Sequence, residues 1–327
     1  MSPAEPLPAP GRRALLIVNP SAGRGRAAKQ QAPVAAALRA AGYAVTEHRS
    51  TNLSHATRLA AAEPPESTVF ALGGDGLIGA AANGVIASGA ILVPLGGGRG
   101  NDTVRRFGLP VDPVEGAQRL AELRETRIDV GRILAEADPA LGRPEDRVFL
   151  GVCNVGFDGL ANELGNATRF NLGPLTYLYG GALALMRFGN TRFAVTVDGS
   201  ARAFRGWFVA VGNHGQYGGG ITISPNSRVN SGHLDVATLE GGSVVRVART
   251  FLLAFRGRHG AVPGFRSVPA RTVTIAPAAP GSGPELNVYA DGERIGPLPV
   301  RVETVPAALR VLIHPDAPSL AGGRGAA

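Results

Sequence analysis

The stretch that decides the fold is Thr68-Val69-Phe70-Ala71-Leu72-Gly73-Gly74-Asp75-Gly76. Its apolar first part predicts a buried strand, and the helical spacing of apolar residues over 77–88 predicts a helix directly after it. A glycine-rich turn joins the two. Such a turn lets the backbone approach a large anion, so the segment predicts an α/β fold and also a place for an anion.

The alternation of strand and helix continues on both sides of this stretch. Short apolar runs and helical segments follow one another over residues 14–107, which is the pattern of a parallel sheet covered by helices on both faces. We expect strands at 14–19, 44–48, 68–72 and 91–95, with helices at 26–41, 54–62, 77–88 and 101–107.

Ligands of parallel sheets bind at the loops that leave the carboxyl ends of the strands. In this chain those loops are 19–25, 72–76 and 95–101, and all three contain glycine. Three such loops at one edge of a sheet predict a single shared site.

The pattern changes near Thr126. A helix predicted at 113–125 is followed by many short strands, which indicates a mostly antiparallel β domain. The expected fold class is α/β with two domains, an α/β domain over 1–126 and a β-sandwich domain over 127–327. The expected strands of the second domain cover 127–134, 148–154, 193–198, 203–212, 234–239, 272–276, 286–290 and 309–314.

Asp75 narrows the chemistry of the second loop. A carboxylate repels bare phosphate, so its place inside a phosphate-binding turn is explained if Mg²⁺ bridges it to the phosphates of a nucleotide. The alternative is a glycine turn in which Asp75 only caps a helix.

Two other phosphate motifs do not fit. Residues 74–79 match the dinucleotide pattern G-x-G-x-x-G, but they follow the third strand and the next strand ends without an acidic residue for a ribose. Lys29, the only lysine, does not stand in a Walker loop. Phosphate binding must therefore use backbone amides and arginine.

The third loop repeats this design. It contains four glycines followed by a short helix, and Arg99 can neutralise phosphate charge. Asn101 and Asp102 can either cap that helix or orient a ligand.

Composition excludes several classes of protein. The formal net charge is +8, which favours anionic partners without choosing among them, and the arginine bias has a second explanation in GC-rich coding. Cys153 is the only cysteine, which excludes an internal disulfide and zinc sites built on paired cysteines. With no apolar run long enough for a signal peptide or a membrane span, we expect a cytoplasmic protein.

The ordered set of motifs resembles the diacylglycerol kinase catalytic-domain family, which includes bacterial lipid kinases, sphingosine kinases and ceramide kinases. The resemblance covers nearly the whole chain. It rests on Asn19-Pro20-Ser21-Ala22-Gly23, on Thr51 with His55-Ala56, on Gly73-Gly74-Asp75-Gly76 with Asn83-Gly84, and on Asn154-Val155-Gly156-Phe157-Asp158. It continues through Asn213, Gly218-Gly219-Gly220, Pro225 and Gly232-His233-Leu234-Asp235 to Asp291-Gly292-Glu293.

The resemblance implies an ATP-binding α/β domain and a β-rich domain for the lipid, with ATP and Mg²⁺ in the cleft. It implies phosphorylation of a lipid hydroxyl, and diacylglycerol is the substrate that we expect before any other lipid. It implies Glu293 as the general base, helped by Asp291, and Asp75 beside phosphates and metal. The residues expected to bind the nucleotide are Asn19, Pro20, Ser21, Gly23, Thr51, Gly73, Gly74, Asp75, Gly76, Gly98, Arg99, Asn101 and Asp102. For Asp291 to Glu293, the residues alone favour a hairpin turn.

Departures from the family pattern keep alternatives open. Leu77 stands at a position usually occupied by Thr, Ala80 replaces a Glu, and Ser231 replaces an Asp near a structural magnesium site. The alternatives are a sphingosine-like, ceramide-like or other lipid kinase, an NAD kinase-like enzyme, and a non-catalytic nucleotide-binding or lipid-binding member.

The expected partner is a lipid substrate at a membrane surface, not a nucleic acid, and a homodimer is left open. Residues 244–256 predict an amphipathic helix with Arg246, Arg249 and Arg256 on one side and Val244, Val247, Phe251 and Phe255 around the other. Such a helix can lie on the inner face of an anionic membrane as a peripheral contact, or cover a core with its arginines in solvent.

Overall fold

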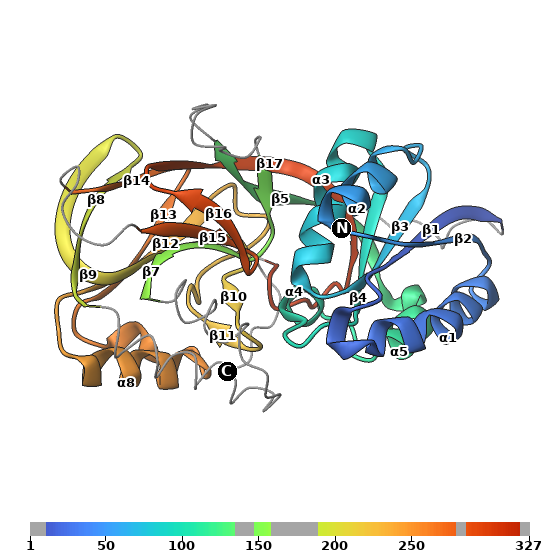
Figure 1. Ribbon diagram of the computed structural model, residues 1–327, viewed down its shortest axis with the longest axis horizontal. Helices are drawn as coiled ribbons and strands as arrows, with labels where there is room; N and C mark the ends of the chain where they lie inside the picture. Colours follow the sequence, from blue (N-terminus) through green and yellow to red (C-terminus); the bar gives the residue numbers. More distant parts are fainter. Residues whose placement is uncertain (1–10, 135–146, 158–188, 279–285, 321–327) are drawn as a thin grey trace. The chain divides into compact units, whose positions relative to one another are not determined.

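The computed structural model describes residues 11–134, 147–157, 189–278 and 286–320. They belong to two compact units: the first is drawn from residues 1–129 and 306–327, the second from 130–305. Two strands, β5 (Arg124–Leu134) and β17 (Val300–Ile313), contribute residues to both units (Figure 1).

A parallel sheet forms the centre of the first unit. Its strands are β1 (Arg12–Val18), β2 (Tyr43–Arg49), β3 (Thr68–Gly73) and β4 (Ile91–Gly96), in the order β2-β1-β3-β4. The end of β17 adds a further parallel strand beside β4, with Val311 opposite Leu92. Every residue of β3 and β4 is buried, which agrees with a sheet covered on both faces.

Helices cover both faces of this sheet. Helices α2 (Leu53–Ala61) and α3 (Asp75–Ser88) lie on one face, with α1 (Arg26–Ala40) and α5 (Pro113–Gln118) on the other (Figure 1). Asn52 caps α2 by accepting the amide of His55 at 2.8 Å, and Asp112 caps α5 by accepting two amides. The elements predicted over residues 14–107 are all present within two residues of their predicted ends, whereas the helix predicted at 113–125 ends at Gln118 and gives way to the 3-10 turn Leu120–Glu122.

The second unit is built from antiparallel strands around β9 (Ser200–Gly212). The first half of β9 pairs with β8 (Thr191–Val197), and its second half pairs with β7 (Val152–Gly156) and β12 (Leu234–Glu240). The remaining strands are β6 (Arg147–Phe149), β10 (Gln216–Tyr217), β11 (Ile221–Thr222), β13 (Phe265–Ala270), β14 (Thr272–Pro277), β15 (Asn287–Ala290) and β16 (Glu293–Pro297). The predicted fold class is confirmed, while β10, β11, β13 and β16 have no counterpart among the predicted strands.

Two apolar clusters stabilise the second unit. One lies among the strands and includes Phe149, Phe193 and Val273. The other includes Trp207, Phe208 and Val247, the last of which belongs to helix α8 (Val244–Ala254). Helix α8 therefore covers one side of the β structure with its buried face. Within the described ranges no helix has both the length and the apolar character that crossing a membrane requires.

Candidate active site

The three glycine loops meet at the carboxyl ends of β1, β3 and β4. In the parallel register Val18 lies opposite Leu72, and Gly73 lies opposite Gly96. The chain leaving β1 bonds to β3, since the Asn19 amide donates to the Leu72 carbonyl at 3.1 Å. The predicted convergence of the three loops is therefore confirmed.

Close backbone contact between these loops explains their glycines. A Cβ on Gly23 would lie 2.5 Å from the carbonyl oxygen of Gly97, and a Cβ on Gly98 would lie 2.5 Å from the Cα of Gly74. Side chains at these positions would push the loops apart. The glycines thus build the site by letting three backbones touch.

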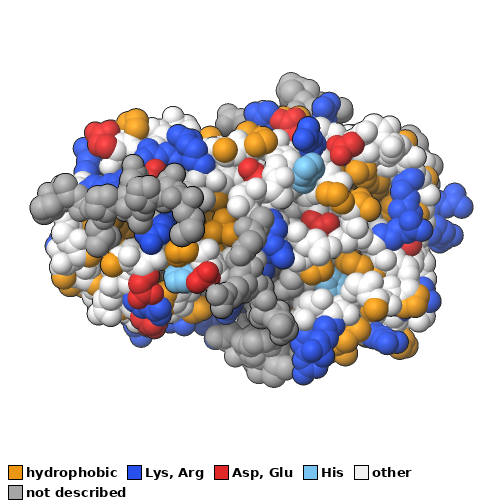
Figure 2. All heavy atoms as spheres, turned by 180° about the vertical axis from the view of Figure 1, so that it is seen from behind, with side chains coloured by type: hydrophobic (Ala, Val, Ile, Leu, Met, Phe, Trp, Pro, Cys, Tyr) orange, Lys and Arg blue, Asp and Glu red, His pale blue; other side chains and the backbone are white. Residues whose placement is uncertain are grey.

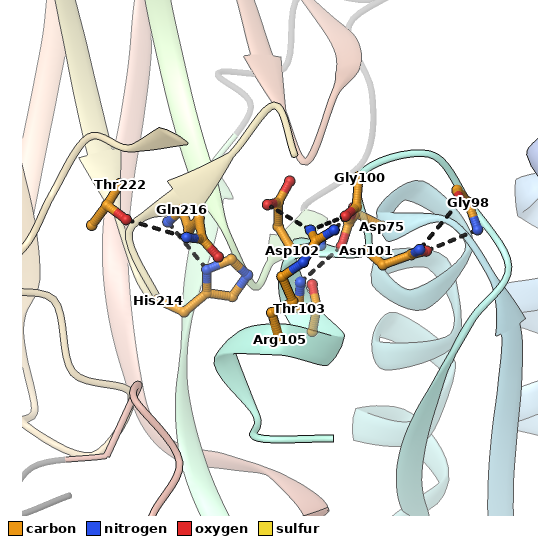
Figure 3. Close-up of polar contacts among 10 residues, drawn as sticks. All are labelled: Asp75, Gly98, Gly100, Asn101, Asp102, Thr103, Arg105, His214, Gln216 and Thr222. Atoms are coloured by element: carbon orange, nitrogen blue, oxygen red, sulfur yellow. Dashed lines mark hydrogen bonds and ion pairs between the residues drawn. The ribbon is translucent and has the colours of Figure 1, made fainter. Parts of the chain in front are cut away.

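Asn101 closes the third loop on itself. Its backbone is in the left-handed region, with φ of 53°, and its side chain is buried. The Oδ1 atom accepts the amide of Gly98 at 2.8 Å and the Nδ2 group donates to the carbonyl of Gly98 at 3.2 Å (Figure 3). Asn101 therefore holds the loop and makes no side-chain cap on the helix that follows.

Asp75 connects two helices. It is the first residue of α3, and its carboxylate accepts the amides of Asp102 at 3.2 Å and of Thr103 at 2.9 Å (Figure 3). These amides begin the short helix α4 (Asp102–Arg106). Asp75 therefore caps α4, whereas α3 itself has Gly74 as its N-cap residue and no side-chain cap. The first amides of α3 are thus available to an anion.

Arginines differ in how they are held at these loops. Arg99 is exposed, and its guanidinium makes no hydrogen bond or ion pair with any residue that the structure describes. Arg105 instead pairs with the Asp102 carboxylate at 3.6 Å and donates to the Gly100 carbonyl. Arg26 reaches the Gly98 carbonyl at 3.4 Å. Arg99 is therefore the arginine of the third loop that remains free for a phosphate.

The first loop and Thr51 are ordered by short-range hydrogen bonds. The Asn19 Oδ1 atom accepts both the amide and the hydroxyl of Ser21, at 3.1 and 2.8 Å, around Pro20. The Nδ1 atom of His55 lies 3.3 Å from the Thr51 amide and 3.2 Å from the Thr51 hydroxyl. His55, which is not among the residues predicted to bind the nucleotide, orients Thr51.

The departures from the family pattern in α3 are packing residues. Leu77 is 2% exposed and its Cδ2 atom would lie 2.5 Å from a Cβ on Gly73, so it covers the glycine turn from behind. Ala80 is buried, and its carbonyl accepts the hydroxyl of Thr57 from α2 at 2.9 Å. Neither side chain offers a polar group to a ligand.

In the second unit, Asp291 and Glu293 have different surroundings. Asp291 is in a left-handed turn, with φ of 48°, and its carboxylate accepts the amides of Leu150 at 2.8 Å and Gly151 at 2.7 Å. Glu293 opens β16 and is half-buried, and its carboxylate makes no hydrogen bond or ion pair with any part of the chain that the structure describes. Asp291 therefore shapes the hairpin turn, and Glu293 keeps its acceptor oxygens.

Residues that the sequence analysis did not assign surround this turn. The Leu150 carbonyl accepts the amide of His214 at 3.1 Å, and a Cβ on Gly151 would lie 3.2 Å from the His214 ring and 2.7 Å from Asp291. Gln216 donates its amide to His214 at 3.3 Å and its side-chain NH₂ to Thr222 at 3.2 Å (Figure 3). No spacing rule in the sequence links positions so far apart.

Asp235 links two neighbouring strands of the second unit. It lies at the start of β12, is buried, and accepts the hydroxyl of Ser267 from β13. Burial raises the pKa of the Asp235 carboxyl. Ser231, at the position of the missing aspartate, donates its hydroxyl to the carbonyls of Arg228 and His233, and so serves the turn itself.

Comparison with known proteins decides the family. Residues 13–133 match the diacylglycerol kinase catalytic domain, and residues 151–313 match the YegS C-terminal NAD kinase beta sandwich-like domain. A diacylglycerol kinase of Mycobacterium tuberculosis is 32% identical over 303 residues, covering 90% of this chain and 93% of the relative. The chain belongs to the diacylglycerol kinase family. Its enzyme class is that of the lipid kinases.

Other proteins similar to this lipid kinase support the same family. A Bacillus subtilis diacylglycerol kinase is 27% identical over 258 residues, which cover 76% of this chain and 80% of the relative. A crystal structure of a candidate diacylglycerol kinase from Bacillus anthracis str. Sterne matches with a TM-score of 0.73 at 21% identity, covering 95% of this chain and 98% of that one. The structural likeness confirms the fold of this lipid kinase.

Proposed function

We propose that this protein transfers the terminal phosphoryl group of ATP to the free hydroxyl of diacylglycerol, which yields phosphatidic acid and ADP. The observation that carries the proposal is the meeting of three glycine loops around Asp75 and the uncapped start of α3. This arrangement supports binding of a polyphosphate, and relatives named diacylglycerol kinase support the choice of lipid.

Nucleotide binding is assigned to the first unit. The amides that open α3 and the exposed Arg99 offer positive charge to the phosphates. Several loop amides already have partners, since Gly97 donates to Gly73 and Gly98 to Asn101. We therefore assign binding of the phosphates to Arg99 and to the amides of Gly74, Asp75 and Gly76 at the start of α3. Asn101 is assigned a structural role.

A magnesium ion fits the residues that are present. Each carboxylate oxygen of Asp75 accepts one amide, and a carboxylate offers about four acceptor positions, so Asp75 keeps capacity for a cation. Among the described residues no three acidic, histidine or cysteine side chains form a metal cluster. Mg²⁺ commonly binds through one or two carboxylates together with substrate phosphates, so Asp75 suffices as the protein ligand. Bound there, Mg²⁺ would neutralise charge on the transferring phosphate.

Proton removal is assigned to Glu293 in the second unit. An alcohol is a poor nucleophile at neutral pH, and a positioned carboxylate accepts its proton as the bond to phosphorus forms. Glu293 has free acceptor oxygens, whereas those of Asp291 are bound to two amides. We propose Glu293 as the base and Asp291 as the residue that fixes the turn before it.

A substrate panel tests the proposal. The purified protein would be incubated with radiolabelled ATP, Mg²⁺ and diacylglycerol, monoacylglycerol, sphingosine, ceramide or phosphatidylglycerol in detergent micelles, with NAD as a soluble acceptor. We expect label in phosphatidic acid that disappears when Mg²⁺ is chelated. Label in another lipid would replace diacylglycerol as the substrate, label in NADP would favour the NAD kinase-like alternative, and no labelled product would favour a non-catalytic member.

A further inference from the structure

Helix α8 carries hydrophobic side chains on its solvent face as well as on its buried face. Val247, Thr250 and Ala254 are fully buried, and Phe251 packs edge-on against Phe157 and Phe208. On the opposite side Val245 is 75% exposed and Leu252 is 59% exposed. Val245 and Leu252 are seven residues apart, so they lie two turns apart on one line along the helix.

Arginines alternate with these apolar side chains. Arg249 follows Val245 by four residues, which places it one turn further along the same face. Arg256 is exposed in the turn that directly follows the end of α8. Figure 2 shows basic and hydrophobic side chains side by side along the lower right edge, where α8 lies in that view. The order Val245, Arg249, Leu252, Arg256 is therefore a mixed apolar and basic stripe, which we name the α8 face.

Among the residues that the structure describes, no acidic side chain pairs with the arginines of the α8 face. Residues 241–284 contain no aspartate or glutamate. Arg249, Arg256 and Arg258 are exposed, and none of their guanidinium groups forms an ion pair or hydrogen bond with any of the described residues. By contrast, Arg202 and Arg266 of the same unit both pair with Glu240. Within the described part of the chain, these arginines thus carry unpaired charge beside exposed apolar groups.

Neither packing on a core nor solvation alone explains such a face. A helix that only covers a core has no reason to expose Val245 and Leu252, and a purely solvated face has no reason to carry them. An interfacial helix requires both kinds of side chain, because apolar groups enter the acyl boundary while arginines contact anionic headgroups.

We infer that the α8 face, Val245, Arg249, Leu252 and Arg256, docks the protein on the surface of an anionic phospholipid bilayer. The inference extends the proposed function, because a lipid alcohol resides in a membrane and its kinase must reach it there. The contact is peripheral: the arginines attract the negative surface and the two apolar side chains enter it.

Vesicle binding tests this inference directly. The full chain would be mixed with vesicles of phosphatidylcholine containing 30 mol% phosphatidylglycerol, and with pure phosphatidylcholine vesicles, and the bound fraction measured by flotation. We expect binding to the anionic vesicles that weakens as salt rises from about 0.1 to about 1 M, since the screening length falls from about 10 to about 3 Å.

Matched variants locate the contact. Arg249→Gln with Arg256→Gln should weaken binding about 30-fold, because each arginine near an anionic surface contributes about fivefold. Arg58→Gln with Arg192→Gln removes the same charge from exposed positions elsewhere and should change binding less than about twofold. Val245→Ser with Leu252→Ser should weaken binding by about tenfold or more, while Val268→Ser, an exposed valine on β13, should not.

Several outcomes would overturn the inference. The first is a wild-type protein that does not bind anionic vesicles. The second is a set of α8 variants that bind vesicles as strongly as the wild type, and the third is a loss of vesicle binding in the Arg58/Arg192 control equal to that in the α8 variants. A dimer in sedimentation velocity that depends on Val245 and Leu252, without vesicle binding, would make a second copy the occupant. Kinase activity in detergent micelles separates this inference from the proposed function. Activity on short-chain diacylglycerol in micelles should be unchanged in the α8 variants. If the wild-type protein has no activity in micelles while vesicle binding depends on α8, the docking surface stands and the proposed function fails.

Discussion

At the scale of single residues, two aspartates of the first unit make the same contact in different places. Asp75 accepts the amides of Asp102 and Thr103, and Asp112 accepts those of Val114 and Glu115 at 2.9 and 3.0 Å. Asp75 does so among the glycine loops, whereas Asp112 starts α5. Comparing variants of these two aspartates therefore distinguishes the effect of losing a helix cap from the effect of losing a group that contacts a ligand.

We predict that Asp75→Asn lowers the rate of phosphoryl transfer by at least about 100-fold, because the change removes the charge that would hold a metal and phosphates. Asp112→Asn should leave the rate within about twofold. Both variants should lose about 1 kcal/mol of unfolding free energy or less, since asparagine still caps well. Steady-state kinetics and urea unfolding measure the two effects. Full turnover by Asp75→Asn would contradict its assignment.

Glu293 and Asp291 form a second pair. We predict that Glu293→Gln lowers kcat by about 10²- to 10⁴-fold with unchanged stability, because its carboxylate has no partner among the described residues and acts only on substrate. Asp291→Asn keeps a residue that tolerates the left-handed conformation, but weakens the bonds to Leu150 and Gly151, so it should cost about 1–3 kcal/mol of unfolding free energy. Measuring kcat and the unfolding midpoint for both variants distinguishes base from scaffold. A normal kcat for Glu293→Gln would exclude it as the base.

At the scale of elements, α2 and α3 pack backbone against backbone. A Cβ on Gly84 of α3 would lie 2.3 Å from the Thr57 carbonyl and 2.6 Å from the Ala60 Cβ of α2. Thr57 also donates its hydroxyl to Ala80 across the same contact. This close approach fixes the direction in which α3 points its first turn.

We predict that Gly84→Ala costs about 1–3 kcal/mol of unfolding free energy through overpacking, despite the higher helix propensity of alanine. Gly260→Ala is the matched control, because a Cβ there meets no atom within 4 Å. Thermal and urea unfolding check both. Equal stability of the Gly84 variant and the wild type would show that the helices can separate without cost.

At the scale of the whole molecule, the stability of the chain depends on pH through buried groups such as His259. His259 is fully buried, its Nε2 lies 3.0 Å from the Ile223 carbonyl, and its ring meets Phe265 edge-on. Burial lowers the pKa of His259, because the charged form loses its hydration. The folded state therefore favours the neutral ring.

We predict that the free energy of unfolding falls as the pH drops below about 6.5, the unfolded pKa of histidine, with a slope of at most about 1.4 kcal/mol per pH unit. As the pH falls, the unfolded chain takes up a proton at His259 before the folded chain does. The contribution of the neutral ring to the free energy of unfolding is therefore complete above about pH 6.5, and it is lost as the pH falls from there to the pKa of His259 in the folded state. His259→Gln should remove this component. Urea titrations of both proteins from pH 8 to pH 5 measure this component. Any contribution of Asp235 to the pH dependence cancels in the comparison, because both proteins contain Asp235. Identical pH profiles would show that His259 does not titrate across this range.

Much of the first unit could be predicted from the chain because its information is local. The apolar run 68–72, the glycine turn and the helix of 77–88 each follow from residues adjacent in sequence, and parallel strands bring their carboxyl ends to one edge. The three loops and Asp75 were found in this way. The second unit was less predictable, since β13 and β16 lack a strong alternating pattern and depend on pairing with β12 and β15.

The fold class, the order of the elements in the first unit, the glycine loops and the membership of a kinase family followed from the sequence alone, because periodicity and motifs are properties of neighbouring residues. Only the tertiary structure decided that Asp75 caps α4, that Asp291 is bound to Leu150 and Gly151 while Glu293 is not, and that Val245 and Leu252 of α8 face solvent. Those contacts depend on which segments, distant in the sequence, meet in space. Packing of the whole fold sets these neighbours, and no local pattern of residues encodes them.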